Sequence, residues 1–346
     1  MGDIDTAKRR RSRGTGHVRI EDVARDASVS AQTVSRFFRD PALVSAPTAQ
    51  KIRASIVATG YVPNLIAGSL ASNRSGIIAI LVPTIANPVH ASPVQGLADA
   101  VRNHGYQVLV GMTDYDRETE HGLIEAFLGR RVDGIVVTGA QLRPDTEALL
   151  RRSGVPTVQL WELPDDPVEM AVGHSNAGIG RAMARHMLER GHRRVAVIGH
   201  AAVADTRSAA RVHGFREVYR EAGETAPVLI EVERPNAIGQ TPALLQRLLA
   251  QRPALQGVFC MTDQVAIGLV LACQREGVAV PGRIAIAGVG DSDLAALVTP
   301  ALTTVRIQRY ELGRRAGQML LARIAGEEVS PAVADLGFSL VVRQST

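Results

Sequence analysis

The sequence predicts a small all-α head followed by a larger α/β core. Residues 17–61 contain apolar residues at helical spacing, interrupted by polar caps and turns. From Gly76 onward, buried strands alternate with amphipathic helices, which is typical of doubly wound parallel sheets. Only 3% of the residues are aromatic, so the core must be built from Ala, Val, Leu and Ile, as suits strands buried on both faces.

The head is expected to contain two short helices joined by a tight turn, within Ile20–Ser45. The first helix runs about Glu21–Ala27, and Ser30 can cap the second, about Ala31–Phe38. Packing of Val29, Val34 and Phe37 against the first helix leaves an outer face of Ala31, Gln32, Ser35 and Arg36. A helix-turn-helix needs this arrangement to enter a DNA major groove, although a plain pair of surface helices is the competing interpretation. A third helix is expected over Ala46–Thr59, capped by Ser45.

The core has too many candidate strands for one sheet, so two Rossmann-like lobes are expected. The candidate strands are Ile77–Val82, Gln107–Gly111, Gly134–Val137, Thr157–Leu160, Arg194–Ile198, Val228–Glu231, Gly257–Cys260 and Ile284–Gly288. Helices between them include Val94–Asn103, Gly178–Arg190 and Leu244–Ala250. Ligands of such folds bind where the carboxyl ends of the strands meet.

Several motifs occur in a fixed order along the chain. Val29-Ser30-x-x-Thr33 is followed by Gly60-Tyr61-x-Pro63-Asn64, a short hinge segment and a strand; GHRRVAVIG (191–199), GVFC (257–260), DQVAIG (263–268) and PALTTV (300–305) come later. This order resembles the LacI/GalR family of transcriptional regulators, from about His17 to Thr346. The stretches TVSRFFRDPALVS, AIAG (285–288) and VSP followed by DLGFSL are most similar to gluconate-type repressors.

The resemblance implies a periplasmic-binding-protein-like core of type I and a division into four parts. These are a disordered basic tail (1–16), a helix-turn-helix DNA-binding domain (17–61), a hinge helix or linker (62–75) and a ligand-binding and dimerisation core (76–346). Lobe one is expected to comprise about 76–172 and 306–333, and lobe two about 173–305 and 334–346. The chain would cross between the lobes three times.

The resemblance also implies which head residues contact DNA. It assigns base reading to Ala31, Gln32 and Arg36, which suit a thymine methyl group, an adenine edge and guanine respectively. Phosphate contacts are expected from Ser30, Thr33, Ser35, Arg39, Ser45 and Thr48.

The hinge is expected to be a second DNA contact. Pro63 suits a first helical turn, and Asn64–Ser72 would continue a helix that is marginal in water because it is short and contains Gly68. The hinge helix is expected to fold only on DNA, where it pairs with the hinge helix of a second subunit. Leu70, next to Ala71, matches the family's leucine that wedges into the minor groove. A homodimer then implies a near-palindromic operator.

The effector site is expected between the lobes. The resemblance assigns Arg211 to the cleft, Asp263 to an acidic position beside the ligand and Thr262 to a position where many members carry asparagine. Further candidates from loops and crossovers are Asn87, His90, Tyr115, Trp161, Arg207 and Arg306. For His90 and Tyr115 a structural role is the competing interpretation.

One departure from the family pattern concerns the loop Gly288-Val289-Gly290-Asp291. Sugar-binding relatives supply an aspartate where this chain has Gly290. Losing that carboxylate while Arg211, Arg207 and Arg306 remain makes the cleft more positive, and an arginine fork matches a carboxylate. We therefore expect an anionic sugar, such as gluconate, a ketogluconate or a phosphorylated sugar acid.

Composition limits the partners and the compartment. The formal net charge is +5 and the excess gathers in Lys8–Arg13, which would add salt-dependent attraction to DNA phosphates. No signal peptide or membrane-spanning run is expected, so the chain is expected to be soluble and cytoplasmic, with no membrane partner. The two cysteines offer no framework for disulfides or zinc, and no cofactor or metal is expected. Because the chain ends soon after the last strand without leucine heptads, a dimer is favoured over a tetramer.

An enzyme is the rival interpretation, and its motifs are missing. Gly178-Ile179-Gly180 is followed by Met183 where a dinucleotide-binding loop needs glycine, and neither a Walker loop nor HExxH occurs. The stretch 173–177, GHSNA, lacks the closing glycine of a nucleophile elbow and resembles a helix cap.

The sequence therefore predicts a non-catalytic, DNA-binding repressor of a carbohydrate-utilisation operon, controlled by a sugar acid. The alternatives left open are a neutral or phosphorylated sugar as effector, an activator or co-repressed regulator, and a sugar-binding receptor without catalysis.

Overall fold

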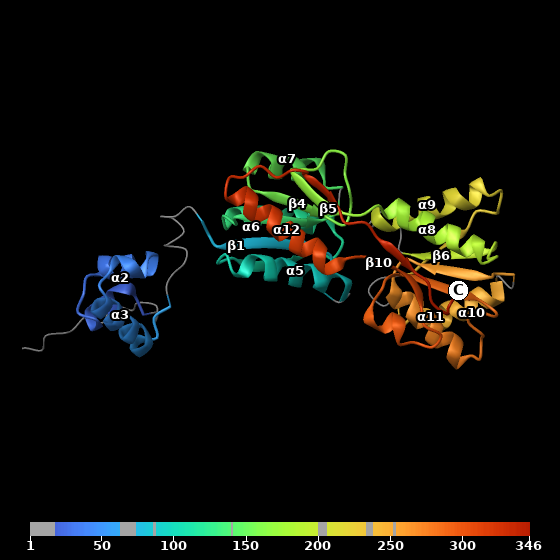
Figure 1. Cartoon of the computed structure of the whole chain (residues 1–346), viewed down its shortest axis with the longest axis horizontal. Helices are drawn as coiled ribbons and strands as arrows, with labels where there is room; N and C mark the ends of the chain where they lie inside the picture. Colours follow the sequence, from blue (N-terminus) through green and yellow to red (C-terminus); the bar gives the residue numbers. More distant parts are fainter. Residues whose placement is uncertain are drawn as a thin grey trace, which may run out of the picture. The chain divides into compact units, whose positions relative to one another are not determined.

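The computed structural model describes residues 18–62, 74–85, 88–139, 141–199, 206–232, 238–251 and 254–346. The chain divides into two units, a head within Met1–Asn73 and a core of Arg74–Thr346 (Figure 1). The expected tail and nearly all of the expected hinge lie outside the described residues. So do four predicted site residues: Asn64, Leu70, Ala71 and Asn87.

The head is a bundle of short helices around one apolar cluster. Its helices are α1 (Ile20–Asp26), α2 (Ala31–Arg39), a 3₁₀ turn (Pro41–Leu43) and α3 (Ala46–Thr59). The cluster consists of Val23, Ala24, Ala27, Val34, Phe37, Ala49 and Ile52. Ser28 takes a left-handed conformation (φ 54°) and makes the turn between α1 and α2 tight. The expected helix-turn-helix and third helix are therefore confirmed.

The two serines that precede α2 and α3 act differently. The Ser30 hydroxyl accepts a hydrogen bond from the Thr33 backbone N–H (3.1 Å), as expected of a helix cap. Ser45 stands at the corresponding position of α3, but its hydroxyl instead contacts the Thr48 hydroxyl (2.9 Å) and no backbone N–H. Ser45 therefore occupies the expected N-cap position of α3, where its backbone carbonyl accepts from the Ala49 N–H (2.9 Å), but its side chain adds no cap.

The core contains two six-stranded sheets of the same design. The first has the order β11-β5-β4-β3-β1-β2 and the second β12-β10-β9-β8-β6-β7. The strands of the first are β1 (Ile77–Val82), β2 (Gln107–Met112), β3 (Gly134–Thr138), β4 (Thr157–Leu160), β5 (Met170–Gly173) and β11 (Val333–Asp335). Those of the second are β6 (Val195–Gly199), β7 (Val228–Glu231), β8 (Gly257–Cys260), β9 (Ala285–Gly290), β10 (Thr303–Arg306) and β12 (Ser339–Val341).

All strand pairs are parallel except β10 with β12. In the first sheet Ile80 of β1 lies opposite Val110 of β2 and Val136 of β3, and in the second Val197 of β6 lies opposite Leu229 and Phe259. The eight expected strands are confirmed, four with the predicted bounds and four with ends shifted by one or two residues. The short β5, β10, β11 and β12 were not among the candidate strands.

Helices cover both faces of each sheet. The helices of the core are α5 (Ala91–Arg102), α6 (Arg117–Gly129), α7 (Pro144–Ser153), α8 (Asn176–Glu189), α9 (Thr206–Glu221), α10 (Thr241–Gln251), α11 (Asp263–Arg275) and α12 (Arg309–Ile324), with 3₁₀ turns η2 (Pro88–His90) and η4 (Asp293–Ala296). Alternate residues of β1 face opposite layers, because Ile80 packs with Leu97 of α5 and Leu81 with Ile124 of α6. Figure 1 shows α12, close to the C-terminus of the chain, lying beside α5 in the first lobe.

The chain passes between the sheets three times, after β5, after β10 and after β11. β11 places Ala334 and Asp335 in the first sheet, so the last crossing follows them. Within the described ranges, no helix combines the length and apolarity needed to cross a membrane.

Close approach of α8 and α9 depends on two glycines. A Cβ at Gly180 would collide with the Arg211 carbonyl, and a Cβ at Gly214 with the Ala177 carbonyl. This explains the Gly178-Ile179-Gly180 stretch without a nucleotide. It also brings Arg211 of α9 next to the first turn of α8.

Candidate DNA-binding surface and effector site

The outer face of α2 carries the polar residues expected to read DNA. Gln32, Ser35, Arg36 and Arg39 are exposed, while Val34 and Phe37 are buried in the head. Gln32, Ser35 and Arg36 lie at spacings of three and four, so they share one helical face.

Ala31 departs from the expected position. It is half-buried and packs against the apolar cluster of the head, because it lies one turn before Val34 on the same side of α2. Its expected place on the outer face is therefore only partly correct.

Hydroxyl groups gather at the starts of α2 and α3. Ser30 and Ser45 are exposed, Thr33 and Thr48 are half-buried, and each serine shares a hydrogen bond with the threonine three residues later (2.8 and 2.9 Å). Two helix starts with hydroxyls and backbone N–H groups suit phosphate oxygens.

The sequence reasoning missed a cation on α3. The guanidinium carbon of Arg53 lies 5.6 Å from the centre of the Phe37 ring, and Lys51, two residues earlier on α3, is exposed. The only signal in the sequence was the positive charge of α3 itself.

In the core, Trp161 lies at the junction of the lobes. It follows β4 in a left-handed conformation (φ 78°) and is 3% exposed. Its ring contacts the imidazoles of His90 (5.9 Å between centroids) and His174 (6.2 Å), both edge-on. The guanidinium carbon of Arg207, from α9 of the second lobe, lies 5.8 Å from the centre of the ring.

A hydrogen-bonded chain links this tryptophan to the second lobe. The Asn176 side chain donates to the Trp161 carbonyl (3.0 Å) and accepts from Nε of Arg211 (2.9 Å). Arg211 also donates to the Met261 carbonyl (3.2 Å) and is 8% exposed. The structure thus brings together Trp161, Arg207, Arg211 and His90, as predicted for one site, and adds His174 and Asn176.

The two histidines beside Trp161, His90 and His174, are both buried. Among the described residues, neither ring nitrogen of His174 has a hydrogen-bond partner, and Nε2 of His90 lies 3.4 Å from the Tyr115 hydroxyl oxygen. Burial, together with the positive charges of Arg211 and Arg207, lowers the pKa of His174 to about 3. His174 is therefore neutral at physiological pH.

Asp263 and Thr262 make hydrogen bonds within the second lobe. The Asp263 carboxylate accepts hydrogen bonds from the Thr304 hydroxyl and from the Ser292 backbone N–H (2.6 Å), and it is buried. Burial raises its pKa and these hydrogen bonds oppose the shift. Thr262 caps α11 by accepting from the Val265 N–H (3.4 Å). A Cβ at Gly290 would lie 3.4 Å from Asp263 Oδ2, so an added carboxylate there would face a buried one.

Arg306 is paired within the second lobe. Its Nε donates to Asp291 (2.6 Å), and Arg343 donates to the other oxygen of the same carboxylate (2.6 Å). Although burial opposes the effect, hydrogen bonds from Arg343 and Arg306 lower the pKa of Asp291. This pairing reduces the positive charge that Arg306 was expected to add to the cleft.

A cavity of about 530 Å³ opens at the carboxyl ends of β1, β2 and β3, the switch point of the first sheet. We call it the junction cavity; it is lined by Pro83, Thr113, Tyr115, Asp116, Arg117, Glu120, Thr138, Gly139, Gln141, Thr206 and Arg207. Arg207 and Thr206 come from the second lobe, and the Thr206 hydroxyl donates to Glu162 (3.0 Å). Sequence reasoning missed Glu120 and Arg117, because a charged helix start usually faces solvent.

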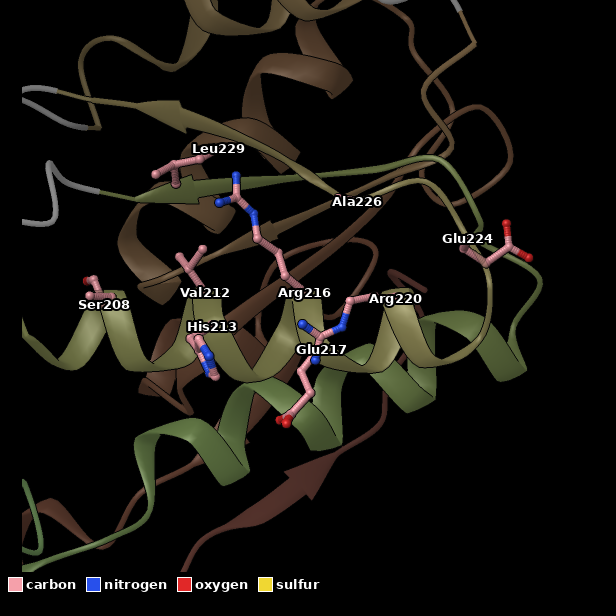
Figure 2. A pocket seen from close by; sticks show the side chains of 10 residues that line it. Ser208, Val212, His213, Arg216, Glu217, Arg220, Glu224, Ala226 and Leu229 are labelled. Carbon is pink, nitrogen blue, oxygen red and sulfur yellow. The ribbon is translucent and has the colours of Figure 1, made fainter.

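A second cavity, of about 410 Å³, lies along α9 and β7 (Figure 2). Both of its glutamates are paired with arginines outside the lining: Glu217 with Arg181, and Glu224 with Arg193. Figure 2 shows Arg216 reaching from α9 towards Leu229, and its Nε donates to the Pro227 carbonyl (3.0 Å). None of the predicted ligand residues lines this cavity. Across the described parts of the chain, no group of three or more His, Cys, Asp or Glu is placed to hold a metal ion.

Comparison with known proteins agrees with this architecture. A model of the bacterial regulatory proteins of the lacI family matches residues 19–64, and a periplasmic binding protein-like domain matches residues 184–346. The HTH-type transcriptional regulator GntR of Pseudomonas aeruginosa is 37% identical over 342 residues, covering 99% of each chain.

Two crystal structures are also similar. A LacI family transcriptional regulator from Silicibacter pomeroyi has a TM-score of 0.89 at 29% identity, covering 95% of this chain and 99% of that one. The transcription regulator GntR from Chromobacterium violaceum has a TM-score of 0.74 at 36% identity, covering 78% and 98%.

A helix-turn-helix head joined to a two-lobed, periplasmic-binding-protein-like core defines a ligand-responsive transcription regulator. The chain belongs to the lacI family of bacterial regulatory proteins. It is a DNA-binding transcriptional regulator with an effector-binding core, and it is not an enzyme. The Ser175 hydroxyl, part of the stretch that resembles a nucleophile elbow, accepts from the Gly178 N–H (3.0 Å) and caps α8.

Proposed function

We propose that this protein is a homodimeric repressor of a carbohydrate-utilisation operon, released from a near-palindromic operator by a gluconate-like sugar acid. The observation that carries the effector assignment is the position of two arginines at Trp161. Arg207 lies over its ring and Arg211 is linked to its carbonyl through Asn176. The resemblance to gluconate-type repressors and to GntR regulators supports the same ligand class.

Charge in the junction cavity is compatible with an anion. Arg117 and Arg207 face it together with Asp116 and Glu120. Asp116 also caps α6, where it accepts from the Thr119 N–H (2.8 Å) and hydroxyl (2.6 Å). Hydroxyl and amide groups of Thr113, Thr138 and Gln141 could bind sugar hydroxyls.

On DNA, we propose that Gln32 and Arg36 read bases while Ser30, Thr33, Ser35, Arg39, Ser45 and Thr48 hold phosphates. The exposed polar face of α2 and the paired hydroxyls at two helix starts support this assignment. Ala31, which is half-buried, would offer only its methyl edge to a thymine.

Apolar side chains left exposed on the core support a homodimer. β2 forms an edge of the first sheet, and its Val110 and Met112 are 40% and 47% exposed. In the second lobe Leu294 and Leu297 are 58% and 75% exposed. A second copy covering these residues would remove them from water.

Closure of the lobes on the effector would shift the position of the first lobe of each subunit relative to that of the partner subunit. This shift would reduce the affinity of the dimer for the operator. The ligand shifts this equilibrium only as far as it prefers one state, and coupling of about 1–3 kcal/mol corresponds to roughly a 5- to 150-fold change in affinity.

The proposal is tested by fluorescence anisotropy of the protein on its own promoter fragment, at fixed salt, with sugar acids and neutral sugars titrated in. We expect release by a sugar acid and no release by glucose. Release by a neutral sugar alone, or tighter DNA binding with ligand, would contradict the proposed effector or the proposed sign of its action.

Arg207→Ala should weaken the response to the sugar acid about 10- to 100-fold while leaving operator affinity unchanged, because a charge-assisted hydrogen bond contributes about 1.5–3 kcal/mol. Arg220→Ala is the matched control, since Arg220 is an exposed arginine on the same helix. Equal responses of the two variants would refute the role of Arg207.

A further inference from the structure

Glu120 has a buried carboxyl group in the wall of the junction cavity. The residue lies on α6 and is 8% exposed. No hydrogen bond or ion pair joins its carboxyl group to any described residue, whereas nearby Asp116 caps the same helix. A buried, unpaired carboxyl group in a cavity wall is costly to the fold unless it serves a ligand.

We propose that the protonation state of Glu120 controls binding at the effector site. An anionic sugar binds when Glu120 is protonated and is repelled when Glu120 is ionised. This inference rests on the proposed sugar-acid function and adds a regulatory input, pH, to the same site. In the neutral form its O–H can donate a hydrogen bond to a ligand oxygen. In the ionised form the cavity gains a second carboxylate beside Asp116.

The surroundings of Glu120 determine when this change occurs. Burial raises the pKa of Glu120 to about 7, although the positive charge of Arg117, one turn earlier on α6, opposes the shift. Asp116, Tyr115 and Arg207 are the other ionisable groups lining the cavity. Of the elements packed against α6, β1 is wholly apolar, and α7 carries Asp145 and Glu147, which are paired with Arg143 and Arg151, and the exposed Arg152. His121 of α6 itself contacts the Thr146 hydroxyl and Glu125.

The ionisation of Glu120 removes the net positive charge of the cavity. With Arg117 and Arg207 positive and Asp116 negative, the four groups sum to one positive charge when Glu120 is protonated and to zero when it is ionised. An anion binds the first state better. By linkage, binding of the anion must also raise the pKa of Glu120, so the complex takes up a proton near neutral pH.

The test is isothermal titration of the full-length protein with gluconate between pH 6 and pH 8.5. We expect the dissociation constant to rise about three- to tenfold per pH unit above pH 7, and proton uptake to appear as a dependence of the heat on buffer ionisation enthalpy. Glu120→Gln keeps the shape and removes the charge, so its affinity should stay nearly constant over this range.

Glu118→Gln serves as the control, because Glu118 is an exposed glutamate on the same helix, paired with Arg143. The inference fails if wild-type affinity is independent of pH, or if Glu120→Gln retains the wild-type slope although gluconate binds. Absence of binding by any sugar acid at any pH would overturn the proposed effector class, and this inference with it. Because the buffer experiment uses the wild-type protein, it remains decisive if the variant does not fold.

Discussion

At the scale of single residues, the structure uses several polar groups in the interior that the chain does not fully satisfy. His174 is 1% exposed, and neither of its ring nitrogens has a hydrogen-bond partner in the part of the chain that the structure describes. Asp263 is equally buried, yet both of its oxygens accept hydrogen bonds. Buried polar groups of the first kind reduce the stability of the fold and cluster where ligands bind, whereas those of the second kind hold strands together.

The lowered pKa of His174 predicts sensitivity to acid. Its pKa is about 3 in the folded protein and near 6.5 when unfolded, so the unfolded state binds more protons between these values. The contribution of neutral His174 to the free energy of unfolding is therefore fully present above pH 6.5 and is lost as the pH falls. At pH 5 this residue lowers the free energy of unfolding by about 2 kcal/mol.

Urea unfolding of the core at pH 7 and pH 5 checks this prediction. His174→Phe keeps an aromatic ring against Trp161 and should reduce the acid-induced loss, leaving smaller contributions from His186 and His192, whose pKa values are also lowered. An identical loss in wild type and variant would show that His174 does not cause it.

At the scale of secondary-structure elements, the starts of helices carry the contacts that matter most. α2 begins at a true side-chain cap, α3 at a serine that bonds another hydroxyl, and α8 at Ser175 next to the Asn176 that joins the lobes. The pair α8 and α9 shows how packing positions a functional side chain. Their contact through Gly180 and Gly214 places Arg211 against Asn176.

The difference between the two serines of the head gives a test by hydrogen exchange without DNA. Ser30→Ala should speed exchange in α2 by several-fold, because loss of the cap costs about 1 kcal/mol. Ser45→Ala should change exchange in α3 much less, since its hydroxyl bonds no backbone N–H. Equal effects on the two helices would contradict the assigned capping roles.

At the scale of the whole molecule, the core is two copies of one sheet design joined by three crossings. Because matching strands end on the same side in each sheet, residues far apart in the chain, such as His90, Trp161 and Arg207, meet at one junction. Exposed apolar residues remain on β2 and around η4.

The proposed dimer predicts that Met112→Glu or Leu297→Glu yields monomers with operator affinity reduced about 100-fold or more, because two linked half-sites bind by avidity. Sedimentation velocity and operator anisotropy measure the two effects. Val342→Glu, at another exposed apolar residue of the second lobe, should behave as wild type. Variants that stay dimeric would place the interface elsewhere.

Much of this protein could be predicted from its sequence because the relevant signals are local. Helical spacing in the head, the Ser30 cap, and the alternation of apolar strands with helices depend on neighbours within a few residues, and each was confirmed. The short strands β5, β10, β11 and β12 were not predicted, because their three or four residues carry little pattern of their own.

The sequence by itself determined the family, the two-lobed architecture and the polar face of α2. Only the tertiary structure decided which charges are paired. Asp291 neutralises Arg306, Asp263 accepts hydrogen bonds from Thr304 and Ser292, and the carboxyl group of Glu120 lines a cavity without a hydrogen bond or ion pair to another described residue. The reason is physical, since burial and pairing arise from contacts between residues remote in the chain, and these contacts set the charge of the site.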